Sequence, residues 1–281
     1  MKNSNILIAI ATYKEAENIV NLIEQIRINY PEIKILVIND FSNDGTREAL
    51  DKLKDKNLIF LERPTKLGLG TAHKLSIFYA IKFQYDYLLT MDADLSHEPK
   101  SIPDLLNYAD KNNFVIGSRF CEGGKTDLKG FRKIISSGGN FFAKKLLNIK
   151  LNEITTYFRV YSVELLKQLP YDELNAQGYS LGVKLVWLMK KLNANLVETP
   201  IHFRDRNKGQ SKIPKLQVFI SFFDCIKIKL KDILIEQKFY KSNPTFNFQL
   251  KCTNCKENCF FSLNNKIYKC LVCNKINNEK Y

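Results

Sequence analysis

Two aspartates stand one residue apart in the segment TMDADLSHEP, residues 90–99, directly after the apolar run YDYLL. Alternate side chains of an extended chain point the same way, so the carboxylates of Asp92 and Asp94 can reach one ion. Mg²⁺ and Mn²⁺ prefer oxygen ligands and commonly take one or two protein carboxylates together with phosphate oxygens. The alternative is a polar loop in which Asp94 caps the next helix and Asp92 is a solvated strand end. The spacing alone does not decide between them.

The sequence that must position these aspartates alternates apolar strands with amphipathic helices. We expect strands and helices to follow one another, the strands at 5–11, 34–40, 57–62 and 85–92, and the helices at 15–28, 47–53 and 69–83. Alternation with short links predicts an α/β fold, with a parallel sheet covered by helices on both faces.

Each of these strands ends in a polar cluster that a core does not need. The clusters are TYKE, NDFSNDGT, RPTKLGLG and DADLSH, in chain order. Ligands of parallel α/β sheets bind beyond the carboxyl ends of the strands. The sequence therefore predicts a binding site at one edge of the sheet.

The second half of the chain is less regular. Strands are expected at 113–120 and 194–203, a glycine- and lysine-bearing loop at 123–132, and a basic loop at 204–212. A lysine-rich helix with a phenylalanine-rich apolar stripe is expected at 218–239.

The segment DADLSHEPKSIPDL closely resembles the strand-end motif of dolichol-phosphate mannosyltransferases, which are inverting family 2 glycosyltransferases of the A-type fold. Further motifs follow in the family's order from about residue 6 to 212: ATYKEAENI, INDFSNDGT, RPTKLGLGTAHKLS, GSRF and PIHFRDRNKGQSK. The resemblance implies a Rossmann-like nucleotide-diphospho-sugar transferase domain. It also implies a GDP-mannose donor, a polyprenyl phosphate acceptor and Mg²⁺ or Mn²⁺ as cofactor.

The same resemblance assigns roles to individual residues. Asp92 and Asp94 would be the catalytic metal ligands, with Ser96 as an auxiliary ligand. The nucleotide sugar would be held by Thr12, Tyr13, Glu15, Asp40, Lys66, Gly68 and Arg206. The acceptor phosphate would be bound by Arg119, Arg132 and Lys212. The residue types alone also permit plainer roles: Glu15 opening a helix, Asp40 capping a turn, and each cation on the surface.

The chain departs from the family pattern at several positions. Ala11, Lys14 and Asn39 replace the usual residues on the nucleotide side. On the acceptor side the replacements are Glu153 for aspartate, Tyr157 for glycine, and Gly182 and Lys184 for a glutamine and a glutamate. These changes leave nucleotide-diphosphate chemistry in place and put the exact sugar and acceptor in question. We expect His97 and His202 to have structural roles.

The composition and net charge of the chain limit which partners and which cellular location we expect. The chain has 281 residues, 45% of them hydrophobic, and a formal net charge of +14. That charge favours anionic partners, and the resemblance favours a nucleotide sugar and a lipid phosphate over nucleic acid. We expect a cytoplasmic protein with no transmembrane helix, since no apolar run approaches the roughly 18 residues that span a bilayer.

Five of the seven cysteines lie between residues 252 and 273. Cys252, Cys255, Cys270 and Cys273 have the spacing C-x2-C-x14-C-x2-C, which is typical of a tetrathiolate zinc ribbon. We therefore divide the chain into a transferase domain (1–217), a helix (218–240) and a zinc-ribbon-like tail with structural Zn²⁺ and an unknown partner (241–281).

Two questions stay open at this level. The helix at 218–240 could pack on the main domain or dock on a membrane surface, with its lysines near anionic head groups. The rivals to a polyprenyl-phosphate mannosyltransferase are a family 2 enzyme with another sugar nucleotide or a saccharide acceptor, and an inactive fold that serves as a binding module.

Overall fold

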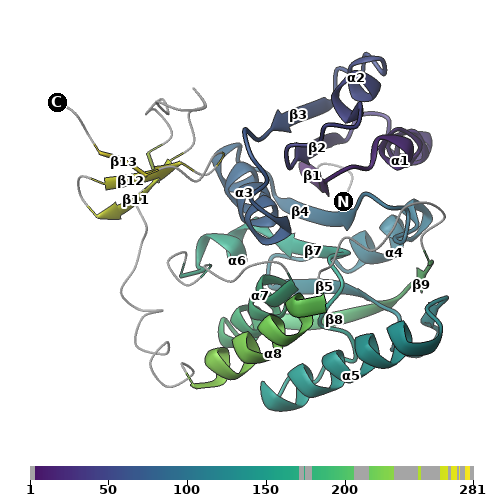
Figure 1. Cartoon of the computed structure of the whole chain (residues 1–281), viewed down its shortest axis with the longest axis vertical. Coiled ribbons are helices and arrows are strands. Elements are labelled where there is room, and N and C mark those ends of the chain that lie inside the picture. Colours follow the sequence, from purple (N-terminus) through teal and green to yellow (C-terminus); the bar gives the residue numbers. More distant parts are fainter. Residues whose placement is uncertain are drawn as a thin grey trace.

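The computed structural model describes residues 4–170, 174, 179–205, 215–230, 246–247, 260–264, 267–270, 272 and 276–278. Its centre is a seven-stranded mixed sheet in the order β3-β2-β1-β4-β7-β5-β8 (Figure 1). The strands are β1 (Ile6–Thr12), β2 (Lys34–Asn39), β3 (Leu58–Glu62), β4 (Tyr87–Asp92), β5 (Asn113–Ser118), β7 (Arg159–Ser162) and β8 (Asn195–Pro200).

The first four strands are parallel, as the sequence predicts. Four or five consecutive residues are buried in each of β1, β2 and β4, as expected for strands covered on both faces. Helices α1 (Ala16–Asn29), α2 (Thr46–Asp51) and α3 (Leu69–Lys82) connect them. The predicted ends of these elements differ from the observed ones by two residues or fewer.

Helices cover the sheet on both faces (Figure 1). On one face α1, α2 and the short α4 (Ile102–Asn107), which follows the 3₁₀ turn η1 (Pro99–Ser101), pack over Ile8, Val37 and Leu89. On the other, α3, α6 (Val163–Lys167) and α7 (Tyr179–Lys191) surround the core residues Phe78, Phe114 and Trp187. Two further helices, α5 (Gly130–Leu146) and α8 (Lys215–Leu230), lie against each other, and α8 packs on α7.

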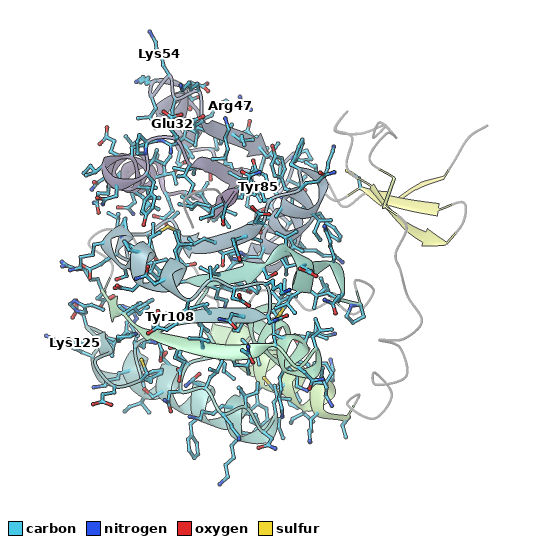
Figure 2. All side chains as sticks on the ribbon, turned by 180° about the vertical axis from the view of Figure 1, so that it is seen from behind. Glu32, Arg47, Lys54, Tyr85, Tyr108 and Lys125 are labelled. Atoms are coloured by element: carbon cyan, nitrogen blue, oxygen red, sulfur yellow. The ribbon has the colours of Figure 1, made fainter. Side chains whose placement is uncertain are left out.

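The second half corrects the sequence prediction at several points. Strand β7, which was not predicted, runs antiparallel to both β4 and β5. The expected strand at 113–120 ends at Ser118, and the one at 194–203 divides into β8 and β9 (His202–Phe203). The expected loop at 123–132 contains β6 (Lys125–Thr126) and the first turn of α5. Figure 2 shows Lys125 at the periphery of the molecule, on β6.

A short ladder joins these segments to the loop that follows β4. β6 and β9 pair in parallel, and His97 forms an isolated antiparallel bridge with Phe203. The N–H of Arg204 also donates to the carbonyl of Ser96, at 3.1 Å. The segment after Asp92 is thus tied to the start of α5.

The predicted helix at 218–239 begins three residues earlier, at Lys215, and is described as far as Leu230. In the tail, β10 (Phe246–Asn247), β11 (Phe260–Asn264), β12 (Ile267–Cys270) and β13 (Ile276–Asn278) form an antiparallel sheet in that order. Among the described helices, none has the length and apolar character needed to cross a bilayer.

Candidate active site

The register of the parallel strands brings the four polar clusters to one edge. Thr12 pairs with Asn39, Asn39 with Glu62, and Ala11 with Asp92. The carboxyl ends of β1 to β4 therefore finish level with one another, as the strand alternation predicts. This edge positions TYKE, NDFSNDGT, RPTKLGLG and DADLSH side by side.

His97 holds the backbone of Asp92 in place. The N–H of Asp92 donates to His97 Nδ1 at 3.0 Å, and the imidazole stacks on Phe158 with ring centroids 5.0 Å apart. Burial lowers the pKa of His97 to about 3, so the ring is neutral. Because Nδ1 accepts a hydrogen bond, the proton of the neutral ring belongs on Nε2, which lies 3.7 Å from Asp92 Oδ2. His97 supports the loop, as expected.

The Asp92 side chain is 30% exposed, whereas the imidazole behind it is fully buried. Its carboxylate is therefore partly exposed at the end of β4, on a backbone that His97 fixes. This is the arrangement that an ion bound partly by protein and partly by a ligand's phosphates requires.

Asp94 and Ser96 form a closed turn. Asp94 Oδ1 accepts from the N–H of Ser96 at 3.1 Å and from its hydroxyl at 2.6 Å. Such a turn compensates for the left-handed conformation of Leu95, at φ 62°. Ser96 is buried and donates its hydroxyl proton to Asp94, so the structure gives it a role inside the loop. Its contact with a metal stays a prediction.

Asp40 has a different environment, although it follows β2, which ends at the same edge of the sheet on the other side of β1. Its Oδ1 accepts from Arg63 Nη1 at 2.9 Å and from the N–H of Leu67 at 2.8 Å. Its Oδ2 accepts from the N–H of Gly68 at 2.7 Å. With 5% of the residue exposed, Asp40 organises the loop that begins α3. The predicted contact between Asp40 and a nucleotide is not tested by this geometry.

Arg63 is the counter-charge of Asp40, and sequence reasoning gave it no role. Burial lowers the pKa of its guanidinium, and the adjacent Asp40 carboxylate acts in the opposite direction. Arg63 also donates to Thr71 at 2.8 Å, which ties it to α3. Gly68 is the N-cap residue of that helix and has φ 89°, a conformation that L side chains rarely adopt.

Tyr13 and Lys66, both expected to hold the nucleotide sugar, lie in contact at this edge. The ammonium of Lys66 lies 3.9 Å from the centre of the Tyr13 ring. Glu15 is the N-cap residue of α1 and accepts from Asn18 Nδ2 at 2.7 Å. Thr12 is buried, and its carbonyl accepts from the N–H of Asp40 at 2.9 Å. These residues line the edge around the two carboxylate loops.

The predicted acceptor residues fall into two groups. Arg119 is buried and donates to Glu153 at 2.7 Å and to Thr155 at 3.0 Å. Arg132, on the first turn of α5, forms an exposed ion pair with Asp205 at 2.9 Å. Arg206 and Lys212 lie outside the described residues, as do Cys252, Cys255 and Cys273 of the tail. Cys270 is described and buried.

Two departures from the family pattern meet in space. A Cβ on Gly182 would lie 3.1 Å from Tyr157 Cζ, so the glycine makes room for the tyrosine ring. The Tyr157 ring also stacks on His73, with centroids 3.8 Å apart and planes at 1°. Thr90 on β4 donates to the Tyr157 carbonyl at 2.6 Å. Sequence reasoning noted each departure but could not pair them, because 25 positions separate the residues.

Comparison with known proteins identifies the family. Residues 7–170 match the model of glycosyl transferase family 2, which is more than half of the chain. The chain belongs to this family. It is an α/β glycosyltransferase.

Among curated family 2 relatives, the undecaprenyl-phosphate mannosyltransferase of Micrococcus luteus is 35% identical over 211 residues, covering 74% of this chain and 87% of the relative. The polyprenol monophosphomannose synthase of Mycolicibacterium smegmatis is 32% identical over 212 residues, covering 74% and 80%.

Solved structures share the fold at low identity. Glucosyl-3-phosphoglycerate synthase from Mycobacterium tuberculosis, in complex with Mn²⁺, UDP and glucosyl-3-phosphoglycerate, has a TM-score of 0.55 at 17% identity, covering 82% of this chain and 80% of that one. Mannosyl-3-phosphoglycerate synthase from Rubrobacter xylanophilus has a TM-score of 0.57 at 14% identity, covering 92% and 86%.

A divalent metal fits the residues at the end of β4. Asp92 and Asp94 supply oxygen atoms, the ligand type that Mg²⁺ and Mn²⁺ prefer. In the part of the chain that the structure describes, no group of three or more acidic, histidine or cysteine side chains could hold an ion. The two carboxylates thus suit a metal that takes its remaining ligands from water and a diphosphate.

Proposed function

We propose that this protein transfers mannose from GDP-mannose to the phosphate of a polyprenyl phosphate, with inversion at the anomeric carbon. The observation that carries the proposal is the carboxylate of Asp92, part-exposed at the end of β4 and fixed from behind by His97, in a family 2 chain. The choice of mannose and a polyprenyl phosphate is supported by the two curated relatives, whose names specify both.

The chemistry needs little from the protein beyond positioning. An oxygen of the acceptor phosphate is already a nucleophile at neutral pH, so no general base is required. It forms a bond to C1 of mannose as the bond from C1 to the GDP phosphate oxygen breaks. Asp92 and Asp94 would hold Mg²⁺ or Mn²⁺, which neutralises the charge that develops on the departing diphosphate.

We assign the remaining binding roles to residues along this edge of the sheet. Tyr13 and Lys66, which contact each other, would face the nucleotide together with Thr12, Glu15 and Arg206. Asp40 and Gly68 would act through the loop that they shape. Arg132 and Lys212 would contact the acceptor phosphate. Because Glu153 pairs with Arg119, we assign that arginine a place in the wall of the acceptor site.

A transfer assay tests this function. Purified protein is incubated with GDP-[¹⁴C]mannose and a polyprenyl phosphate in detergent, with Mn²⁺ or with EDTA. We expect label in the lipid extract only when Mn²⁺ is present. Transfer from another labelled sugar nucleotide would contradict GDP-mannose as the donor. Transfer into a saccharide would contradict a polyprenyl phosphate as the acceptor. Absence of binding to every sugar nucleotide would leave a binding module as the function.

We further propose that Cys252, Cys255, Cys270 and Cys273 hold one structural Zn²⁺ in the tail, on the strength of their spacing. Metal analysis of the full chain, purified without chelator, should find about one zinc per chain. Cys255→Ser should release it, whereas Cys259→Ser, a cysteine outside the pattern, should retain it. Full zinc content in Cys255→Ser would contradict the site.

A further inference from the structure

Helix α5 carries its apolar side chains away from the core. The exposed fractions are 75% for Phe131, 69% for Ile134, 38% for Ile135 and 61% for Phe141. Within the helix only Asn140 and Ala143 are buried, and no residue from Lys129 to Gly139 is. An amphipathic helix on a globular domain normally buries its apolar stripe. The first half of α5 instead exposes its apolar side chains to solvent.

These residues form a single stripe. At 100° per residue, positions 131, 134, 135 and 141 fall within about a third of the helix circumference. Gly138, at the centre of that stripe, has no atom within 4 Å of an added Cβ. The stripe is therefore continuous along the helix and open toward solvent.

Helix α8 extends the stripe, because the two helices lie side by side (Figure 1). The rings of Phe142 and Phe222 stack at a centroid distance of 4.3 Å, and Phe223 meets Phe222 edge-on at 5.8 Å. Phe223 and Leu230 are largely exposed. We call Phe131, Ile134, Ile135, Phe141, Phe222, Phe223 and Leu230 the α5–α8 apolar surface.

Along α5 every charge has one sign, although Arg132 of α5 pairs with Asp205 and Lys227 of α8 pairs with Asp224. From Leu128 to Leu151 the sequence has no aspartate or glutamate and six cationic residues: Lys129, Arg132, Lys133, Lys144, Lys145 and Lys150. Bulky apolar side chains beside lysines are the pattern by which interfacial helices bind anionic bilayers. The excess of cations beside the apolar stripe of α5 favours an anionic lipid surface as its partner.

The surface adjoins the active site through the β6–β9 ladder. Three residues separate β6 from α5, β9 pairs with β6, and Phe203 of β9 bridges to His97 behind Asp92. Arg132, a predicted ligand of the acceptor phosphate, stands on the first turn of α5. Contact between α5 and lipid would bring the head-group layer to the acceptor side of the catalytic edge.

We propose that the α5–α8 apolar surface docks on an anionic lipid bilayer, with α5 as the inserting helix. This inference rests on the proposed function in one respect: it explains how the site reaches a phosphate whose chain is dissolved in lipid. Docking itself requires neither donor nor acceptor and can be measured without them.

Vesicle flotation with the full chain tests docking, using vesicles of phosphatidylcholine with or without phosphatidylglycerol. The wild-type protein should float with the anionic vesicles. Ile134→Ser should weaken partitioning about tenfold, because one large apolar side chain is lost from the lipid boundary. Ile28→Ser is the matched control: Ile28 is 79% exposed on α1, outside the surface, and its substitution should change nothing.

A pair of charge-reversal variants tests the electrostatic part of the binding. Lys133→Glu, on α5, should reduce binding to anionic vesicles about fivefold or more, since each cation near such a surface contributes measurably. Lys111→Glu, on an exposed loop after α4, should not. Equal flotation of Ile134→Ser and wild type would overturn the proposal. So would a failure of the wild type to float together with a dimer that Ile134→Ser dissociates.

Transfer to two acceptors separates docking from function. With a long polyprenyl phosphate in vesicles, Ile134→Ser should lose activity in proportion to its lost binding. With a short, water-soluble isoprenyl phosphate, it should match the wild type. Vesicle binding without any transfer would uphold docking and reject the proposed function. Transfer without vesicle binding would uphold the proposed function and reject docking.

Discussion

Asp40 follows β2 and Asp92 ends β4, so the two carboxylates lie on either side of β1 at one edge of the sheet. Protein donors occupy both oxygens of Asp40: Arg63 and the N–H groups of Leu67 and Gly68. At Asp92 the protein secures the backbone through His97 and leaves the side chain 30% exposed. The same residue type at the ends of two parallel strands thus builds a loop in one place and is partly exposed in the other, where we propose that it binds the metal.

This difference has a general physical basis. A carboxylate whose oxygens are filled by buried donors contributes to folding and is costly to remove. A carboxylate at the mouth of a site keeps contact with water until a cation replaces it. Removing it therefore costs little stability and much activity. Measuring the stability and activity of variants at either aspartate tests this difference.

The largest expected effect on stability comes from Asp40→Ala. It leaves the guanidinium of Arg63, which is fully buried, without its counter-charge. Breaking a buried ion pair in this way costs about 3–5 kcal/mol. Urea denaturation should show that loss for Asp40→Ala and less than about 0.5 kcal/mol for Asp92→Asn. Equal losses in the two variants would remove the distinction between the loops.

His73 should give the next largest effect, under acid conditions. It lies on α3, which starts at the loop held by Asp40, and stacks on Tyr157, whose carbonyl binds Thr90 of β4. Burial lowers its pKa from 6.5 to about 3. Below pH 6.5 the unfolded chain therefore binds a proton that the folded ring rejects, and stability falls as the pH falls toward 3.

Replacement by phenylalanine keeps the stack and removes the titration. The free energy of unfolding of His73→Phe should decline less between pH 7 and pH 5 than that of the wild type, by about 2 kcal/mol. Urea denaturation in metal-free buffer at both pH values measures it. Parallel declines in the two proteins would contradict a neutral, buried His73.

Ser96→Ala should have the smallest effect. It removes the hydroxyl that donates to Asp94 and keeps the backbone N–H bond to the same oxygen. The expected loss of stability is about 1 kcal/mol, and Mn²⁺ affinity should stay within about tenfold of wild type, the lower end of the effect of removing a hydrogen bond to a ligating carboxylate, as calorimetry can measure. A much larger fall in Mn²⁺ affinity would make Ser96 a metal ligand and the loop less self-contained.

Sequence alone was sufficient for the half of the fold whose signals are local. Each of β1 to β4 is a continuous apolar run followed by a helix, and parallel register then fixes where Asp40 and Asp92 lie. β7 could not be found in this way, because four residues that pair antiparallel with β4 and β5 depend on long-range contacts. α5 was missed because Gly138 and Gly139 favour a loop and its apolar residues do not face a core.

The candidate site likewise has one part that the local sequence predicts and another that depends on long-range contacts. The local sequence was sufficient to place the two aspartates of DADLSH at the end of β4, where we expect the metal. The donors that occupy Asp40 come from a loop 27 and 28 positions away, and the pairing of Tyr157 with Gly182 spans 25 positions. Such contacts decide whether a carboxylate binds protein or ligand, and no local pattern encodes them.

The central claim is that Asp92 carries the metal that binds the donor's diphosphate. Titration calorimetry of GDP-mannose into Asp92→Asn, with and without Mn²⁺, tests it most directly. Asp86→Asn is the control, since Asp86 lies exposed just before the opposite end of β4. We predict that Mn²⁺ strengthens donor binding to the wild type and to Asp86→Asn, and that Asp92→Asn loses about a hundredfold of that affinity. Wild-type affinity and Mn²⁺ dependence in Asp92→Asn would contradict the account.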